Sequence, residues 1–164
     1  MKKRKKQNII ILSIALVMVG AIVAYNYSFE QTKQKGFKFG QELEQIQSDV
    51  KELQTQFYSM KAQWEEGDIT KEELFQYYEK HLNEFKKIIS KYDSLVPPET
   101  FVGATDLLKL SSETQLESDI QYIEWMKTGD ESFKIRSDEQ YQEALEYEMT
   151  GLVEFYTAKS GRLP

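Results

Sequence analysis

The fold is decided by residues 39–67, FGQELEQIQSDVKELQTQFYSMKAQWEEG. Apolar side chains recur in this stretch at spacings that alternate between four and three residues. Such spacing places them on one side of an α-helix and does not fit a strand, in which successive side chains point to opposite faces. The apolar positions are Phe39, Leu43, Ile46, Val50, Leu53, Phe57, Met60 and Trp64. The sequence therefore predicts a long amphipathic helix with a heptad seam.

The residues after this seam specify a break and a new helix. Gly67 tolerates the left-handed backbone conformation that ends many helices. Thr70 and Glu73 have the spacing of a capping box, in which each side chain bonds a free N–H group at a helix start. We expect a second helix over residues 71–93, with an apolar stripe wide enough for two neighbours. The Pro-Pro pair at residues 97–98 ends it.

Two more helices are expected, over residues 98–127 and 131–159, with Gly129 between them. The predicted inner faces consist of Phe101, Leu108, Leu116, Ile123 and Met126 in the third helix, and of Tyr141, Leu145, Met149, Leu152, Phe155 and Tyr156 in the fourth. Residues 39–159 are thus predicted to form an all-α, up-down-up-down four-helix bundle made of two helical hairpins. The tail, residues 160–164, should fray.

The N-terminal residues predict a membrane anchor. A basic tail at residues 1–7 precedes residues 8–27, which carry no charge. A helix of this length spans about 30 Å, the thickness of the hydrocarbon core of a bilayer. Because positive residues favour the cytoplasmic side, we expect a single-pass protein of the cell membrane with its C-terminal domain outside the cytoplasm. A cleaved signal peptide is the alternative, since Gly20 and Ala21 are small enough for a peptidase site.

A juxtamembrane joint is expected at residues 28–38, between the anchor and the bundle. Gly36 and Gly40 lie at its end and weaken a helix by about 1 kcal/mol each, which favours flexibility there.

Charge after the anchor is strongly acidic. All 27 Asp and Glu residues follow Tyr27, together with 16 of the 21 Lys and Arg residues, for a net charge of −11. Nucleic-acid phosphates would be repelled by such a domain, as would anionic lipid along its length. The expected partners are therefore the bilayer, through residues 8–27, and a protein of the membrane or envelope.

No catalytic or metal-binding constellation is recognisable in the sequence. The chain has no cysteine and one histidine, which excludes thiolate chemistry and multi-histidine metal sites. His81 and Glu84 have a spacing used in di-metal bundles, but such sites need a second pair. We expect a protein that is not an enzyme and that has no metal and no cofactor.

Two tryptophans are candidate partner-binding residues. Trp64 and Trp125 each stand shortly before a Gly-Asp turn, which places both at the membrane-distal end of the predicted bundle. One interpretation is that the two rings fill the end of the core. The other is that they form an exposed aromatic patch covered by a partner.

The third predicted helix also has a polar centre. Ser112, Gln115 and Asp119 lie on one side of it and suggest a polar pocket. The alternative is a surface-facing or kinked stretch in which hydroxyl groups bond back to carbonyls of their own helix.

An anchor followed by a bundle resembles the four-helix sensing domains of bacterial receptors. The anchor with the heptad seam up to Trp64 also resembles small division proteins with one membrane helix and an extracytoplasmic coil. Neither resemblance rests on residues specific to a family. The sequence favours an extracytoplasmic protein-binding or envelope scaffold module, with a sensor-like domain that binds a small ligand as the alternative.

Overall fold

A computed structural model describes residues 36–160. The predicted basic tail, the predicted membrane helix at residues 8–27 and residues 161–164 lie outside this range. Of the expected joint, residues 36–38 are described, and they are helical rather than irregular. Within residues 36–160, no helix has the length and apolar character needed to cross a membrane.

The described chain is all-α, as predicted. A first helix, described over residues 36–66, is followed by α2 (Lys71–Tyr92), a short 3-10 turn η1 (Glu99–Phe101), α3 (Val102–Thr128) and α4 (Glu131–Lys159). From residue 39 onward these helices form one compact unit.

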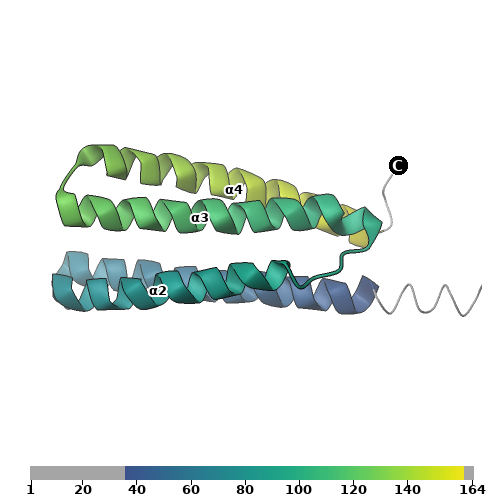
Figure 1. The fold of residues 1–164 in the computed structure, drawn as a ribbon, viewed down its shortest axis with the longest axis horizontal. Coiled ribbons are helices and arrows are strands. Elements are labelled where there is room, and N and C mark those ends of the chain that lie inside the picture. The colour runs from purple at the N-terminus through teal and green to yellow at the C-terminus, as the bar shows by residue number, and fades with distance from the viewer. Residues whose placement is uncertain (1–35, 161–164) are drawn as a thin grey trace, which may run out of the picture. The chain divides into compact units, whose positions relative to one another are not determined.

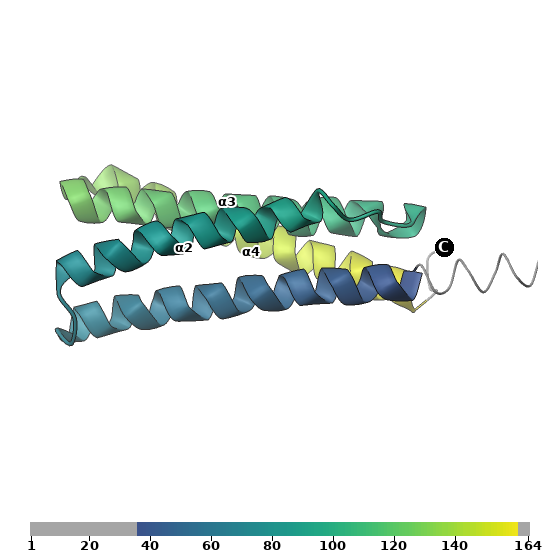
Figure 2. The same ribbon diagram turned by 60° about the horizontal axis from the view of Figure 1, so that its bottom comes forward.

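The four helices pack as two antiparallel hairpins that lie side by side (Figures 1 and 2). Helix 36–66 pairs with α2, and α3 pairs with α4. Both Gly-Asp turns lie at one end of the bundle, whereas the connection from α2 to α3 lies at the other end (Figure 1). The predicted hairpins are confirmed, and chain direction alternates from helix to helix.

The predicted turn chemistry is present. Gly67 and Gly129 have φ values of 83° and 73°, the left-handed conformation that closes a helix. Thr70 accepts a hydrogen bond from the backbone N–H of Glu73 at 3.2 Å, and the Glu73 carboxylate accepts one from the Thr70 N–H at 2.8 Å. Asp130 caps α4 by accepting a hydrogen bond from the Ser132 N–H at 2.9 Å.

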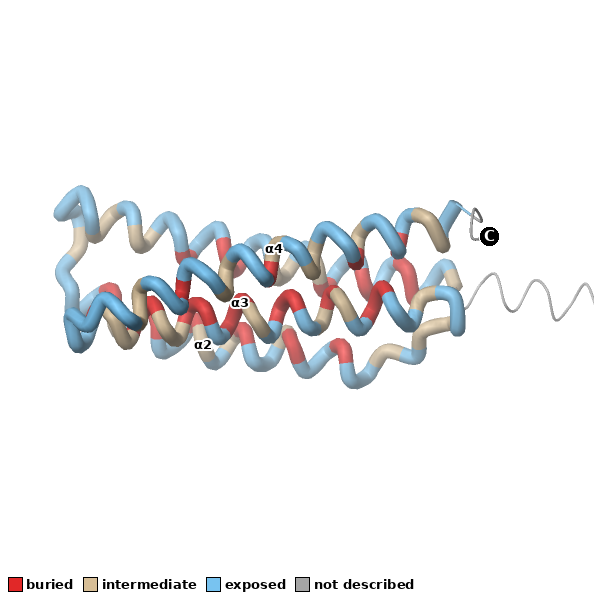
Figure 3. Tube along the Cα trace, turned by 90° about the horizontal axis from the view of Figure 1, so that it is seen from above, coloured by how far each residue is buried: buried red, intermediate tan, exposed pale blue. Residues whose placement is uncertain are grey.

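Buried residues recur along the length of each helix of the bundle (Figure 3). The heptad seam of helix 36–66 faces this core, although Val50, Met60 and Trp64 are only half-buried. The core is continuous from the α2–α3 connection to the Gly-Asp turns. Its largest fully buried side chains are Tyr78, Phe85, Phe155, Leu43, Leu74, Leu108 and His81.

The predicted inner face of the fourth helix is wrong in part. Met149 and Tyr156 are 69% and 56% exposed, and only Phe155 of the predicted set is fully buried. The residues of α4 that are buried are Ser137, Ala144, Gly151 and Phe155. Small side chains, not large apolar ones, face α3.

These small residues form a close-packed seam with α3. Ser137, Ala144 and Gly151 are spaced seven residues apart, as are the buried residues Ala104, Ser111 and Ser118 of α3. The Ser118 hydroxyl donates a hydrogen bond to the Ser137 carbonyl at 2.8 Å, and the Ser111 hydroxyl donates one to the Ala144 carbonyl at 2.8 Å. Side-chain oxygens of one helix thus reach the backbone of the other, which requires close approach of the two helices.

Gly151 lies in this seam at a point where α3 leaves little room for a side chain. A Cβ atom at this position would be 2.9 Å from Leu108 Cγ and 3.2 Å from Leu107 Cβ. Both distances are shorter than ordinary carbon–carbon contacts, so a larger residue would force the helices apart.

Candidate functional site

A buried polar cluster lies where the two hairpins meet. The His81 Nε2 atom of α2 lies 2.8 Å from Asp119 Oδ2 of α3. Gln54, from helix 36–66, donates a hydrogen bond from Nε2 to the same oxygen at 2.8 Å. All three residues are buried, with exposed fractions of 1%, 3% and 6% for His81, Asp119 and Gln54. Asp119 therefore joins both helices of the first hairpin to the second.

Aromatic rings enclose the His81 imidazole. The Phe57 ring stacks on it with centroids 4.6 Å apart, Tyr77 stacks at 6.1 Å, and Phe85 approaches edge-on at 5.7 Å. These rings keep water from the imidazole, which lowers the local dielectric and strengthens its interaction with Asp119.

Burial raises the pKa of Asp119 above its usual range, because the charged carboxylate is poorly solvated. The hydrogen bond from His81 and the attraction of its ring act in the opposite direction, as does the hydrogen bond from Gln54. Within residues 36–160, no serine, threonine or cysteine side chain is hydrogen-bonded to His81. The cluster joins the two hairpins through the hydrogen bonds to Asp119, while His81 Nδ1 is buried without a hydrogen-bond partner in the described structure.

His81 and Glu84 do not converge on one site. His81 is directed at Asp119, whereas Glu84 lies 3.8 Å from Lys80 at the surface. The described part of the chain has no group of three or more histidine or carboxylate side chains placed to hold a metal ion.

A polar pocket opens beside this cluster, between helix 36–66, α3 and α4. Its volume is about 310 Å³. Lys51, Thr55 and Tyr58 form its exposed rim, and Gln54, Ser111, Ser112 and Gln115 are its buried residues. The remaining lining residues are Gln47, Val50, Tyr141, Leu145 and Glu148.

Two of the three residues predicted for a polar pocket, Ser112 and Gln115, line this one. Asp119 does not, but it is bonded to Gln54, which does. Ligand binding there stays a prediction. The alternative was that serine hydroxyls of this helix bond back to carbonyls of the same helix. Of Ser111, Ser112 and Ser118, only Ser112 does so, donating to the Leu108 carbonyl at 3.0 Å.

Aromatic side chains flank the mouth of the pocket. The rings of Tyr58 and Tyr141 meet edge-to-face with centroids 6.0 Å apart. Burial raises the pKa of Tyr58, and interactions with Tyr141 and Asp119 add to this effect. The phenol is therefore uncharged at neutral pH.

The two predicted partner-binding tryptophans lie in the same layer of the bundle. Trp64 and Trp125 are both half-buried and pack against the cluster around Phe57 and Tyr122. Trp125 also donates a hydrogen bond from its indole nitrogen to Glu131 at 3.1 Å. Core packing thus accounts for one side of each ring, and a role in partner binding stays a prediction.

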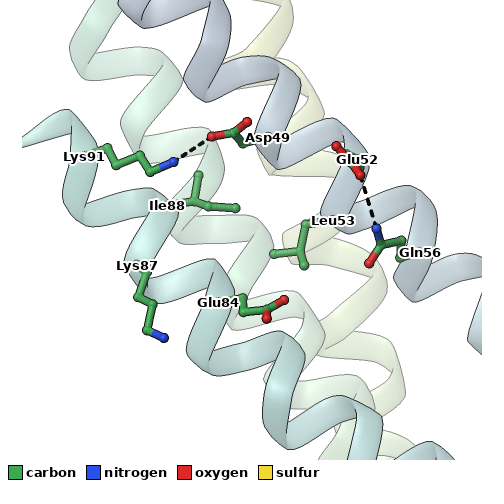
Figure 4. Close-up of a pocket in the computed structure, with 8 residues that line it drawn as sticks. All are labelled: Asp49, Glu52, Leu53, Gln56, Glu84, Lys87, Ile88 and Lys91. Atoms are coloured by element: carbon green, nitrogen blue, oxygen red, sulfur yellow. Dashed lines mark hydrogen bonds and ion pairs between the residues drawn. The ribbon is translucent and has the colours of Figure 1, made fainter.

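A second groove, between helix 36–66 and α2, is shown in Figure 4. Its volume is about 380 Å³, with Leu53 and Ile88 between charged side chains. The Lys91 ammonium, which lines this groove, lies 2.7 Å from Asp49 and so already has an ion-pair partner. No buried polar atom without a partner lies among the residues that line it, unlike the pocket beside Gln54.

The sequence pattern did not reveal one surface feature. Met149, Val153 and Tyr156 of α4 expose 69%, 66% and 56% of their surface, although their spacing resembles that of core residues. The signal that identifies them is indirect. Once Ser137, Ala144 and Gly151 are recognised as the seam, these apolar residues fall on the opposite side of the helix.

Comparison with known proteins gives no relatives: no family model matches the chain, and neither does a curated protein or a solved structure.

Proposed function

We propose that the chain is a single-pass membrane protein whose helical bundle lies outside the cytoplasm and binds another protein of the membrane or envelope. The uncharged segment at residues 8–27, preceded by a basic tail, supports the anchor and its orientation. The exposed apolar face of α4 is the observation that carries the binding role.

This face consists of Met149, Val153 and Tyr156, which we call the α4 face. Its residues lie in the last three turns of α4, on the side away from the small-residue seam. Clustered exposed apolar side chains are costly in water and commonly mark a surface that a partner covers.

The charges around the α4 face define the chemistry of the partner. Residues 138–158 contain six acidic residues and no basic one. Lys159, whose ammonium lies 6.0 Å from the Tyr156 ring centroid, is paired with Glu44 at 2.6 Å. An amphipathic helix with an apolar stripe and flanking Lys or Arg residues would match both properties. Anionic lipid would be repelled by the same charges, which favours a protein partner.

Single-cysteine labelling tests the anchor and its orientation, because the chain has no cysteine of its own. Gln142→Cys places a thiol on the exposed side of α4, and Arg4→Cys places one in the basic tail. In intact cells, a membrane-impermeant maleimide should label the first variant and not the second. Labelling of Arg4→Cys alone, or release of the Gln142→Cys protein into the medium, would overturn the proposal.

Site-specific photocrosslinking of the full chain in membranes tests the partner. A photoreactive residue at position 153 should form one discrete adduct through a basic segment of another protein, and Met149→Ser should reduce it. The control is a photoreactive residue at position 113 of α3, which is exposed and lies away from the α4 face. Adducts with a second copy of the chain, with lipid, or equally from both positions would refute the proposed partner.

A small-ligand-binding function is the second candidate. It is favoured by the pocket that contains Ser112 and Gln115, and this pocket has a chemical character of its own.

A further inference from the structure

The pocket between helix 36–66, α3 and α4 has buried hydrogen-bond acceptors whose companion donors are already used. We propose that it binds a small molecule through a primary ammonium group. This inference goes beyond the proposed protein-binding role and does not depend on it.

Three hydroxyl groups in the pocket have no proton left to donate. Thr55 donates to the Lys51 carbonyl at 2.8 Å, Ser111 donates to the Ala144 carbonyl at 2.8 Å, and Ser112 donates to the Leu108 carbonyl at 3.0 Å. A carbonyl has no hydrogen, so the hydroxyl must supply it in each case. What these three oxygens can offer a ligand is lone pairs, and Ser112 keeps one of its two, because the Tyr92 hydroxyl lies 3.2 Å away and donates to the other.

Gln54 adds a fourth acceptor at greater depth. Its amide nitrogen donates to Asp119 at 2.8 Å, which fixes the orientation of the amide. Its Oε1 atom is buried and has no hydrogen-bond partner, although the side chain lines the pocket and is only 6% exposed. A buried carbonyl oxygen without a donor is costly, and a ligand that donates to it would recover that free energy.

An ammonium group matches such a lining best. It has three N–H donors and no acceptor, so no part of it needs a donor from the protein. A hydroxyl group of a polyol also has lone pairs, which would compete for donors that the three side-chain hydroxyls cannot provide.

The charged and aromatic side chains of the pocket also favour a cationic ligand. Glu148 lines the pocket, and the rings of Tyr58 and Tyr141 stand at its mouth, where they present π-electrons to a cation. The bundle is acidic overall, which raises the local concentration of cations. The one opposing group in the lining is Lys51, at the exposed rim. A volume of about 310 Å³ is at the small end for ligand pockets, so the ligand is a small amine.

Three probes of matched size separate the chemistry of the ligand. Ethanolamine, ethylene glycol and glycolate differ in charge and have similar shapes. Each is titrated into the full chain in detergent micelles at pH 7 and constant ionic strength, and binding is followed by ligand-observed NMR. Ethanolamine should bind and the other two should not. Equal binding of ethylene glycol, or preference for glycolate, would overturn the proposal.

Variants locate the binding site. Thr55→Val and Ser112→Ala each remove one acceptor and should weaken ethanolamine binding roughly two- to tenfold, the range for one hydrogen bond. The matched control is Thr114→Val, which makes the same change on α3 in a different groove. Because Thr55 is exposed, Thr55→Val should fold even if Ser112→Ala does not. Binding that neither variant weakens would place the amine elsewhere and refute the site.

Two charged side chains that line the pocket test whether it favours a cation. Lys51→Met should tighten ethanolamine binding by removing a repulsive charge, and Glu148→Gln should weaken it. Opposite signs would mean that ethanolamine does not bind beside these two side chains and would contradict the proposal.

Discussion

Within each hairpin of the bundle, the two helices pack against each other through a different kind of side chain. Helix 36–66 and α2 meet through large apolar residues, with Phe57 and Tyr78 rings 4.9 Å apart. In contrast, α3 and α4 meet through serine, alanine and glycine, with hydroxyl groups that bond the opposite backbone at 2.8 Å. The first hairpin depends on buried apolar area, which tolerates repacking. The second depends on close backbone approach, which does not.

This difference explains where polar chemistry lies in the molecule. Because small residues fill the α3–α4 seam, the large apolar residues of α4 do not all have a place in the core, and Met149, Val153 and Tyr156 stay on the surface. The α3 face toward the first hairpin then carries Ser112, Gln115 and Asp119, which supply the buried polar cluster and part of the polar pocket.

The largest expected effect comes from breaking the tie between the hairpins. His81→Leu leaves the buried Asp119 carboxyl with only the hydrogen bond from Gln54 and should cost about 3–5 kcal/mol of unfolding free energy. Chemical denaturation followed by circular dichroism measures this loss. The double variant His81→Leu with Asp119→Leu should recover part of it, since both members of the pair are then apolar.

A surface ion pair provides the control for the tie. Lys80→Gln removes an exposed contact with Glu84 at 3.8 Å and should cost under about 1 kcal/mol. Similar losses for His81→Leu and Lys80→Gln would mean that the buried cluster does not join the hairpins.

Overpacking the small-residue seam should have the next largest effect. In Gly151→Leu, the added Cβ atom would lie only 2.9 Å from Leu108 Cγ. The substitution should therefore destabilise the bundle by about 2–3 kcal/mol. Gly40→Ala is the matched control in the first helix, where the new Cβ would meet Phe155 Cζ at 3.8 Å, an ordinary contact. It should stabilise by up to about 1 kcal/mol, because alanine favours helix. If Gly151→Leu is as stable as wild type under thermal denaturation, the seam is not close-packed.

Alkaline pH should weaken the first hairpin through its tyrosines. Burial raises the pKa of Tyr92 in α2 to about 12, from about 10 in the unfolded chain. Its contribution is therefore complete below pH 10 and is lost as pH rises toward 12, by roughly 3 kcal/mol. Unfolding free energies measured across this range should fall less steeply in Tyr92→Phe. An unchanged slope would exclude Tyr92 as a source of the loss.

The smallest effect is expected at single hydroxyl groups in the α3–α4 seam. Ser118→Ala removes the hydrogen bond to the Ser137 carbonyl and should cost about 1 kcal/mol. Ser90→Ala removes a hydroxyl whose bond at 2.8 Å is to the Lys87 carbonyl of its own helix, at an exposed position, and should change stability by less than about 0.5 kcal/mol. Equal effects in urea denaturation would show that the interhelical bonds add nothing to the second hairpin.

Local sequence signals were sufficient for most of the fold. Helix breaks at Gly67 and Gly129, the capping box at Thr70 and the heptad seam of helix 36–66 each depend on residues that are close in sequence. The apolar spacing of α4 led to a partly wrong inner face, because the exposed residues Met149 and Tyr156 fit a helical stripe as well as core residues do. A pattern of small residues at 137, 144 and 151 was also present, but its meaning depends on the register of a second helix.

The candidate site was only partly accessible from the sequence. The polarity of Ser112, Gln115 and Asp119 suggested a pocket, yet Gln54 was hidden among the polar residues of the first helix. Nothing local distinguishes Gln54 from its exposed neighbours Thr55 and Gln56.

By itself, the sequence determined that this chain makes helices and that Gly67 and Gly129 break them into hairpins, because caps, glycines and apolar periods act within a few residues. Only the tertiary structure decided that α3 and α4 pack through small side chains, that Asp119 joins His81 to Gln54, and that the α4 face stays on the surface. The physical reason is that these features depend on the distance between helix backbones, which is set by residues far apart in the chain.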